Sequence, residues 1–469
     1  MFHYTGTYTD LYQLSMAQVY FDTGRQKETA VFEYYFRRLP FGGGYAVFCG
    51  LETLLDIVES LRFEDADIEF LKGYGFSEPF LGYLKTFHFQ GQIFSSREGD
   101  LVFPNRPILQ VEATLMEAQI LETLLLNVLN FQTLIATKAS RMRQVAGKSG
   151  LIDFGLRRAQ GPAGYYAARA AVVGGFDATS NVVAARDFGI EASGTMAHSF
   201  VQSYENELEA FRDFATYRPE GCVLLVDTYN TLKSGIPHAI TVAKEMETRG
   251  QKLLAVRLDS GDLAYLARET RKMLDDAGLN YVKIAASNQL DEKVIKSLQE
   301  QQAPIDIYGV GTSLIIGRPD AALDGVYKLV EHNDIPVIKL SENIEKVTTP
   351  GKKQVFRMEK DGKWIGADVV GLRDEAAMEM MHSPTDPLKS MSVKDCRFEP
   401  LLSPVMDKGK RVHGKRSLEE IAAYAEAQLQ KLPAESKRFE YPHIYKIGLS
   451  EALFTLRNNL IQQRKSQEA

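Results

Sequence analysis

The sequence predicts an α/β protein, in which an irregular (β/α) barrel is combined with a split α+β domain built from the segments before and after it. Two observations lead to this fold class. From residue 151 onward, short apolar runs that end in polar or acidic residues alternate with helical stretches, and the last four runs start about 23 to 30 residues apart, the length of a strand plus a helix. On either side of this region, short alternating strands and turn residues prevail.

Repeated βα units form either a barrel or a doubly wound sheet. A barrel is favoured because polar groups recur at the carboxyl ends of the runs, where barrel enzymes collect their active sites, and because no dinucleotide-binding glycine fingerprint occurs. The six expected strands are 151–155, 188–194, 223–227, 253–259, 282–287 and 305–311. The expected domains are an N-terminal α+β domain (1–125), a barrel catalytic domain (126–324), strands that rejoin the N-terminal domain (325–400) and a C-terminal helical extension (401–469).

The flanking segments carry their own signals. A helix capped by Thr9 or Asp10 is expected up to Gly24. The other expected elements before the barrel are a strand over 31–36, a helix over 51–61, short antiparallel strands between 87 and 113, and a helix over 116–131. After the barrel we expect strands over 326–330 and 336–340, a hairpin at Asp361-Gly362 and a capping box that opens a helix at Ser417.

Composition limits the partners. The chain has 469 residues, 45% of them hydrophobic, and a net charge of -6, which argues against nucleic acid because phosphate backbones require a surplus of Lys and Arg. No signal-peptide pattern and no run of about 18 apolar residues occurs, so we expect no membrane association. The cysteines, Cys49, Cys222 and Cys396, show neither disulfide-framework nor metal-ligand spacing. A reducing cytoplasm fits best.

One stretch is a candidate reaction centre, Gly194-Thr195-Met196-Ala197-His198-Ser199. It follows an apolar run and precedes a helical segment, so His198 lies near two hydroxyls, a glycine turn and the free N–H groups of a helix start, which attract phosphate. A histidine in this position can equally be a hydrogen-bonded structural residue. The residues at the other strand ends help to decide between a catalytic and a structural role for His198.

The ends of the expected strands carry arginines, carboxylates and a glycine-rich loop. The candidates are Phe154, Arg157, Thr195, His198, Asp227, Arg257, Asp259, Ser287, Asn288, Gly309, Gly311 and Thr312. Arginines bind carboxylates or phosphate oxygens bidentately, a glycine-threonine loop presents N–H groups to a terminal phosphate, and carboxylates suit ribose hydroxyls or a Mg²⁺ ion that arrives with a diphosphate. The combination predicts a site for an anionic, phosphate-bearing substrate.

Purely structural interpretations exist for the same residues. Asp227 can cap the helix that follows it, and Arg257 and Asp259 can simply pair with each other. Their joint recurrence on successive strand ends favours a functional site.

Six motifs follow one another in a fixed order along the chain. They are Tyr8-Thr9-Asp10-Leu11-Tyr12-Gln13, Asp153-Phe154-Gly155-Leu156-Arg157-Arg158, Gly194-Thr195-Met196-Ala197-His198-Ser199-Phe200, Val226-Asp227-Thr228-Tyr229, Arg257-Leu258-Asp259-Ser260-Gly261-Asp262 and Gly309-Val310-Gly311-Thr312. The stretch 346–353 extends the series. With these motifs the chain resembles the nicotinate phosphoribosyltransferases, which open the salvage of nicotinic acid toward NAD.

The resemblance implies the reaction. Nicotinate and 5-phosphoribosyl 1-diphosphate give nicotinate mononucleotide and diphosphate, with ATP hydrolysis coupled through a phosphohistidine at His198. Asp227 and Asp259 are expected to supply negative charge near the ribose and to be the ligands of Mg²⁺. The residues expected to bind phosphoribosyl diphosphate are Arg257, Asp259, Ser287, Asn288, Gly309, Gly311 and Thr312.

The resemblance also implies a nicotinate pocket. Phe154 would stack on the pyridine ring, with Thr195 nearby, and either Arg157 or Arg257 would meet the carboxylate. Tyr12 would cover the other face of the ring from the partner subunit, because family members share their sites across a homodimer. Ser180 favours the acid, because nicotinamide-using relatives carry an aspartate at that position.

Rival interpretations remain. A nicotinamide phosphoribosyltransferase is the nearest, although Ser180 and the two arginines count against it. A quinolinate-using relative would need more cationic groups and no phosphorylated histidine. A non-catalytic metabolite-binding barrel protein is a third, and a metal-dependent hydrolase is disfavoured because His/Asp ligand clusters are absent from the sequence.

Overall fold

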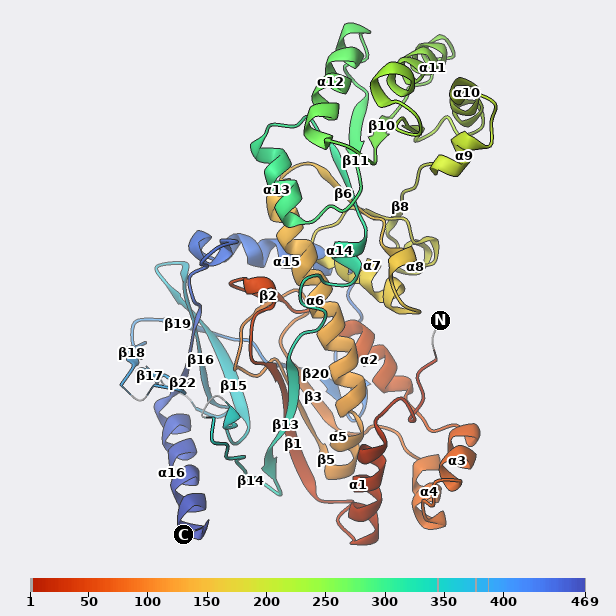
Figure 1. The fold of residues 1–469 in the computed structure, drawn as a ribbon. Helices are drawn as coiled ribbons and strands as arrows, with labels where there is room; N and C mark the ends of the chain where they lie inside the picture. The colour runs from red at the N-terminus through yellow and green to blue at the C-terminus, as the bar shows by residue number, and fades with distance from the viewer. Residues whose placement is uncertain (1–2, 344–345, 376–377, 387, 469) are drawn as a thin grey trace. The chain divides into compact units, whose positions relative to one another are not determined.

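The computed structural model describes residues 3–343, 346–375, 378–386 and 388–468 (Figure 1). The chain divides into two compact units. Unit 1 combines Met1–Thr137 with Ala322–Ala469, and unit 2 is Lys138–Ala321. Unit 1 is therefore assembled from the two ends of the chain.

Unit 2 is built on a parallel sheet of seven strands in the order β8-β7-β6-β12-β11-β10-β9. The strands are β6 (Gly150–Asp153), β7 (Ala178–Thr179), β8 (Glu191–Ala192), β9 (Val223–Leu225), β10 (Ala255–Leu258), β11 (Lys283–Ala286) and β12 (Ile307–Val310). Each strand neighbours the next one in the chain, except that β8 and β9 are the two edges, and the last strand pairs back onto the first. The sheet thus curls into an incomplete barrel, which confirms the predicted fold class.

Two strands differ from their predictions. Strand β7 was not predicted, because two residues are too short to show a periodic pattern. The strand expected over 188–194 is reduced to β8, because helix α8 (Val182–Phe188) occupies its beginning.

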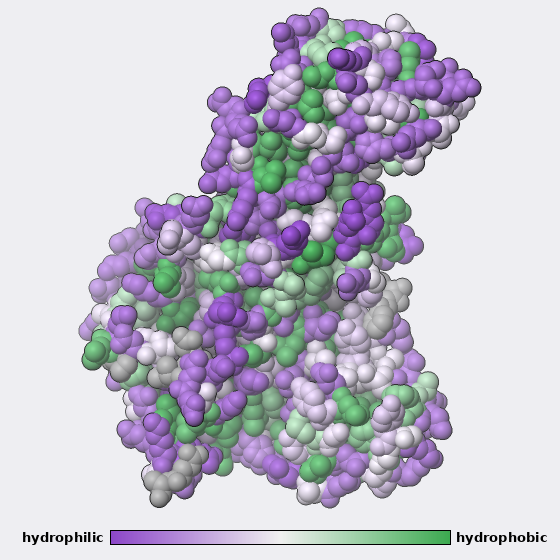
Figure 2. Space-filling model, viewed as in Figure 1, coloured by the Kyte–Doolittle hydropathy of each residue, from purple (hydrophilic) through white to green (hydrophobic). Residues whose placement is uncertain are grey.

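Helices surround the strands of unit 2. They are α7 (Ala163–Val173), α8, α9 (His198–Gln202), α10 (Glu207–Tyr217), α11 (Ile236–Thr248), α12 (Leu263–Asp276), α13 (Glu292–Glu300) and α14 (Thr312–Ile315). Helix α12 shows why they form: Asp262 caps its first turn by accepting a hydrogen bond from Tyr265 N, and Ala264, Ala267 and Leu274 are buried. Hydrophilic residues predominate on the visible surface over α10 and α11 (Figure 2).

Unit 1 contains two larger sheets. The first has seven strands in the order β14-β13-β1-β5-β3-β20-β21. Its strands are β14 (Ile335–Pro336), β13 (Gly325–His332), β1 (Thr29–Phe36), β5 (Leu109–Thr114), β3 (Gln92–Ser95), β20 (Ser403–Asp407) and β21 (Lys410–Arg411). Strand β13 pairs antiparallel with β1, so the chain returns to its N-terminal sheet directly after the barrel.

The second sheet has six strands in the order β18-β17-β22-β16-β15-β19. Its strands are β18 (Ser390–Ser392), β17 (Met380–His382), β22 (Lys446–Ser450), β16 (Lys363–Leu372), β15 (Lys353–Lys360) and β19 (Arg397–Pro400). The expected hairpin joins β15 to β16, and Asp361 and Gly362 have the positive φ values of 52° and 73° that such a turn requires. Most strands after residue 350 therefore form a sheet of their own instead of extending the N-terminal one.

Helices pack on these sheets, and β2 (Ala46–Val47) pairs with β4 (Leu101–Val102). The helices are α1 (Leu11–Asp22), α2 (Leu51–Ser60), α3 (Asp65–Lys72), α4 (Glu78–Lys85), α5 (Leu115–Ile120), α6 (Glu122–Ala146, which continues into unit 2), α15 (Leu418–Lys431) and α16 (Glu451–Glu468). The predicted capping box at Ser417 is present. The segment 401–469 also contains strands β20, β21 and β22, so it is not purely helical as expected. No helix among the described residues is long and apolar enough to cross a membrane.

Candidate active site

The guanidinium of Arg257, on β10, is bonded to side chains that follow two other strands. Its Nε donates to Ser287 Oγ (3.0 Å), and Nη1 donates to Thr195 Oγ1 (2.8 Å) and to the carbonyl of Met196 (3.3 Å). Nη2 donates to Asp259 Oδ1 (3.3 Å), which also accepts the hydroxyl of Ser287. The carboxyl ends of β8, β10 and β11 are thereby linked into one hydrogen-bonded network.

Two carboxylates lie beside the imidazole of His198. Asp227 Oδ2 accepts from the N–H of Asp259 (2.9 Å) and from Ser260 Oγ (2.6 Å). The other oxygen of Asp227 is buried, has no hydrogen-bond partner among the described residues and lies 3.9 Å from His198 Nε2. Asp259 Oδ2 lies 3.7 Å from the same nitrogen, while His198 Nδ1 contacts Thr228 Oγ1 at 3.1 Å. Each carboxylate thus keeps one oxygen near Nε2.

An aromatic ring forms the floor of the site. The guanidinium carbon of Arg257 lies 5.4 Å from the centre of the Phe154 ring. A Cβ atom at Gly309 would sit 2.3 Å from a ring carbon of Phe154, so glycine is needed at this position for the ring to pack against β12. The ring and the cation together form a surface that suits a planar, anionic heterocycle.

The loop after β10 explains how Asp259 and Ser260 are held. Gly261 has φ of +78°, a conformation that other residues rarely adopt, and the next residue, Asp262, caps α12. The turn and the cap fix the backbone on the carboxyl side of the two site residues. Asp227, for which a capping role was an alternative, caps no described helix; Asn230 caps the helical turn after β9.

Asp153, the last residue of β6, stands in one of the motifs but was not predicted to have a role. Its carboxylate is fully buried and accepts hydrogen bonds from Gly155 N (2.7 Å) and Thr179 Oγ1 (2.8 Å). It therefore ties the turn after Phe154 to the strand before Ser180. Burial raises the pKa of this carboxyl. The signal in the sequence was an acidic residue at the end of an apolar run.

Other predicted residues lie at strand ends but outside this network. Arg157 is exposed in the short helical turn Leu156–Arg158 and has no hydrogen bond or ion pair to another described side chain. Ser180 is half-buried and donates its N–H to the carbonyl of Asp153 (2.8 Å). Asn288 is exposed with φ of +86°. Thr312 begins α14, which Gly311 precedes.

Tyr12 belongs to unit 1, on α1, where its side chain is 51% exposed. Leu11 and Val19 of the same helix are similarly exposed, at 53% and 58%. The described part of the chain holds no group of three or more His, Cys, Asp or Glu residues that could bind a metal ion.

Comparisons with known proteins find relatives that match nearly the whole chain. Family models of the nicotinate phosphoribosyltransferase (NAPRTase) N-terminal domain, the NAPRTase family and the NAPRTase C-terminal domain match residues 7–130, 150–376 and 352–457. The chain is 43% identical to a nicotinate phosphoribosyltransferase of Bacillus subtilis, over 98% of this chain and 96% of that protein. It is 40% identical to one of Mycobacterium tuberculosis, over 96% and 93%.

A solved structure extends the likeness to three dimensions. The crystal structure of human nicotinic acid phosphoribosyltransferase superposes with a TM-score of 0.86 at 32% identity, covering 96% of this chain and 99% of that one. The motifs of the site, the family models and the full-length relatives agree. The chain therefore belongs to the nicotinate phosphoribosyltransferase family.

Proposed function

We propose that the chain transfers the phosphoribosyl group of 5-phosphoribosyl 1-diphosphate to nicotinate, coupled to ATP hydrolysis, in NAD salvage. The observation that carries the proposal is the network of Arg257 with Thr195, Asp259 and Ser287, above the ring of Phe154 and beside His198. The network combines a cation, an aromatic ring face and two carboxylates. The ring face and the cation suit an anionic base, and the carboxylates suit a ribose and the Mg²⁺ of a diphosphate. Family membership supports the same reaction.

The base pocket is assigned by chemistry. The pyridine ring of nicotinate stacks on Phe154, and its carboxylate meets Arg257 or the exposed Arg157. Thr195 Oγ1 is held by Arg257 at 2.8 Å and borders the same space. Ser180 leaves room and no negative charge for the carboxylate, so nicotinate is favoured over nicotinamide. The alternative is that the chain uses nicotinamide as its base, which an assay with both bases tests.

The transfer step is dissociative. The bond from ribose C1 to the diphosphate oxygen breaks with its electron pair, and the lone pair of the pyridine nitrogen forms the new bond to C1. No proton has to be removed from the base. The chain's contribution is positioning, together with the negative charge of Asp227 and Asp259 beside the ribosyl cation.

The phosphoribosyl diphosphate is bound by groups at neighbouring strand ends. Gly311 leaves room for phosphate oxygens, because a Cβ there would meet only an ordinary contact at 3.4 Å, and Thr312 offers a hydroxyl at the start of α14. Gly309 contributes by its backbone, since the ring of Phe154 fills the space beside it. Ser287 and Asn288, after β11, stand at the next strand end, with Ser287 bonded to Arg257. These residues are proposed for the 5′-phosphate and the diphosphate.

The two carboxylates also fit Mg²⁺. Asp227 keeps a buried oxygen that accepts no hydrogen bond from a described residue, and Asp259 keeps Oδ2 outside the arginine network. Mg²⁺ prefers a few carboxylates and substrate phosphate oxygens. When bound, it would neutralise charge on the departing diphosphate.

His198 is proposed as the site of phosphorylation by ATP. Its Nδ1 lies 3.1 Å from Thr228 Oγ1, and its Nε2 faces the carboxylates of Asp227 and Asp259. The ring nitrogen that carries the lone pair attacks the γ-phosphorus, the bond to the bridging oxygen breaks and ADP leaves. Water later takes the phosphoryl group and releases phosphate.

We further propose a homodimer with shared sites, in which Tyr12 serves the partner subunit. The exposed apolar side chains of α1 support an interface there. A cytoplasmic location is proposed because none of the three cysteines forms a disulfide in the described part of the chain.

The test is diphosphate release by the purified full-length chain with phosphoribosyl diphosphate and either nicotinate or nicotinamide, with and without ATP. We expect turnover of nicotinate only, stimulated by ATP in the wild type and not in His198→Ala. The matched control is His413→Ala, an exposed histidine of unit 1, which should keep the ATP response. Equal use of nicotinamide would contradict the acid pocket, and an ATP response in His198→Ala would contradict the phosphohistidine.

A further inference from the structure

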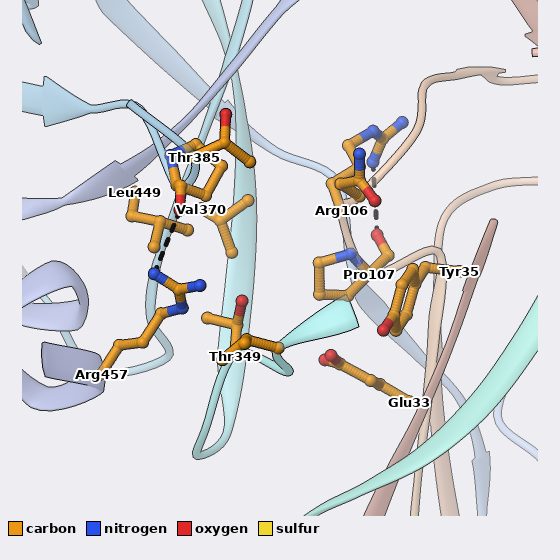
Figure 3. A pocket seen from close by; sticks show the side chains of 12 residues that line it. Glu33, Tyr35, Arg106, Pro107, Thr349, Val370, Thr385, Leu449 and Arg457 are labelled. Atoms are coloured by element: carbon orange, nitrogen blue, oxygen red, sulfur yellow. Dashed lines mark hydrogen bonds between the residues drawn. The ribbon is translucent and has the colours of Figure 1, made fainter. Parts of the chain in front are cut away.

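Unit 1 contains a cavity of about 40 Å³ between its two larger sheets (Figure 3). Glu33 and Tyr35 of β1, Val370 of β16, Leu449 of β22 and Arg457 of α16 contribute to its lining. A cavity needs about 10 to 15 Å³ to hold one water, so this one has room for about three waters or one small polyatomic ion. All of its lining residues belong to unit 1, and the proposed transfer reaction uses none of them.

Arg457 is the unusual group in this lining. The residue is 3% exposed, and only its Nη1 has a hydrogen bond within the described residues, to the carbonyl of Pro384 (3.1 Å). Its Nε is buried with no partner, and no described carboxylate forms an ion pair with the guanidinium. Burial lowers the pKa of Arg457, with no acidic group counteracting it. Figure 3 shows the guanidinium extending from α16 toward Thr349.

The other two charges of the lining have partners of opposite charge, although Asp368, the partner of Arg106, also pairs with Arg357. Glu33 Oε2 lies 3.0 Å from Lys353 Nζ, and Arg106 Nε lies 3.2 Å from Asp368 Oδ2. All four of these side chains are nearly inaccessible to solvent. Among the described residues, Arg457 is thus the charged group of the lining that has no partner of opposite charge, and an isolated buried cation is strongly unfavourable unless an anion or strong hydrogen-bond acceptors accompany it.

We propose that this cavity is a binding site for one small oxyanion, of the size of phosphate or a short carboxylate, held by Arg457. A guanidinium donates two parallel hydrogen bonds to such an anion. Thr349 and Thr385 also line the cavity. Thr385 is exposed and its hydroxyl contacts that of Ser383, so the hydroxyl of Thr349 is the one assigned as a further donor. The anion joins α16 to the residues between β14 and β15, and so stabilises unit 1.

The single tryptophan of the chain, Trp364, lies in unit 1 on β16 and is 7% exposed, so its fluorescence follows the unfolding of that unit. Urea unfolding of the full-length chain is measured by this signal in chloride, acetate and inorganic phosphate at equal ionic strength. The variants are Arg457→Met, which removes the charge, and Arg464→Met, a control at an exposed arginine of the same helix. Thr349→Val is a third variant, which keeps the arginine.

We expect phosphate to raise the urea midpoint of the wild type and of Arg464→Met, with the apparent phosphate affinity about tenfold weaker in Arg457→Met. A rise with acetate as well assigns carboxylates, and a rise with phosphate alone assigns inorganic phosphate. An equal response in Arg457→Met overturns the proposal, because the ion then binds elsewhere. No response in the wild type also overturns it. If Arg457→Met fails to fold, Thr349→Val decides: a weaker response supports the site and an unchanged one refutes it.

Discussion

Replacing Arg257 with lysine tests the central arrangement of the site. The guanidinium donates from three nitrogens to Ser287, Thr195 and Asp259, and its side chain is 13% exposed. A lysine ammonium retains at most one of these contacts, because it lacks the planar fork. Losing two hydrogen bonds of about 1.5 kcal/mol each amounts to about 3 kcal/mol, or roughly a hundredfold in kcat/KM.

The assay is diphosphate release at varied nicotinate and saturating phosphoribosyl diphosphate. Arg268→Lys is the matched control, because Arg268 is exposed on α12 and, within the part of the chain that the structure describes, donates only to the carbonyl of Gln301 (3.4 Å). It should keep the wild-type kcat/KM. Circular dichroism with urea checks that both variants fold. A loss of less than about threefold in a folded Arg257→Lys protein would refute the inference that the fork organises the site.

Three further predictions concern the same unit. Gly309→Ala should raise the nicotinate KM at least about tenfold, because the new methyl group displaces the ring of Phe154; steady-state kinetics measure this. Ser180→Asp should lower kcat/KM for nicotinate about tenfold or more through charge repulsion, while nicotinamide is less affected; parallel assays with both bases give the ratio. Asp153→Asn should change the pH dependence of the free energy of unfolding. Because the pKa of Asp153 is raised in the folded state, its contribution to stability falls as pH rises from the carboxyl's ordinary pKa through the raised value. The neutral amide of the variant does not titrate, so the variant should lack this decline. Urea unfolding at about pH 4 and about pH 7 compares the two proteins.

Each of these three predictions has a control variant or a result that would contradict it. Gly150→Ala, whose methyl group would meet only an ordinary contact with Ile307 at 3.5 Å, should keep the wild-type KM, and an equal change in both alanine variants would count against a specific effect on Phe154. An unchanged base preference in Ser180→Asp removes that residue from specificity. Parallel pH profiles for Asp153→Asn and wild type would show that the buried carboxylate is not the source of the dependence.

The barrel could be predicted because its strands are local in sequence. Each of β9 to β12 is a short apolar run followed by a helix, and the polar residues at their ends stand directly after them in the chain. Strand β7 was missed because its two residues give no pattern, and the reach of Asp153 to Thr179 follows only from the pairing of β6 with β7.

Unit 1 was less predictable for the opposite reason. Strand β22 pairs in parallel with β16, from which it is separated by more than seventy residues, and β20 pairs with β3 from the other end of the chain. No short-range periodicity encodes such partners. The cavity at Arg457 depends on the same long-range packing, so a single arginine in a helical pattern gave no sign of it. At the active site, the polar residues at the strand ends indicated which residues take part. The hydrogen-bond partners of Arg257 could be assigned only from the structure.

The incomplete closure of the barrel bears on the energy of the proposed ATP cycle. Strands β8 and β9 are not paired, and the chain between them, 193–222, carries His198. A phosphoryl group adds about 1.5 to 2 negative charges to a residue that already faces two carboxylates, so the segment must shift when the group arrives. Because β8 and β9 are not hydrogen-bonded to each other, a shift of this segment breaks no hydrogen bonds between paired strands. Local opening there costs less than unfolding the barrel, and amide protons of 193–222 should exchange with solvent sooner than those of β10 and β11.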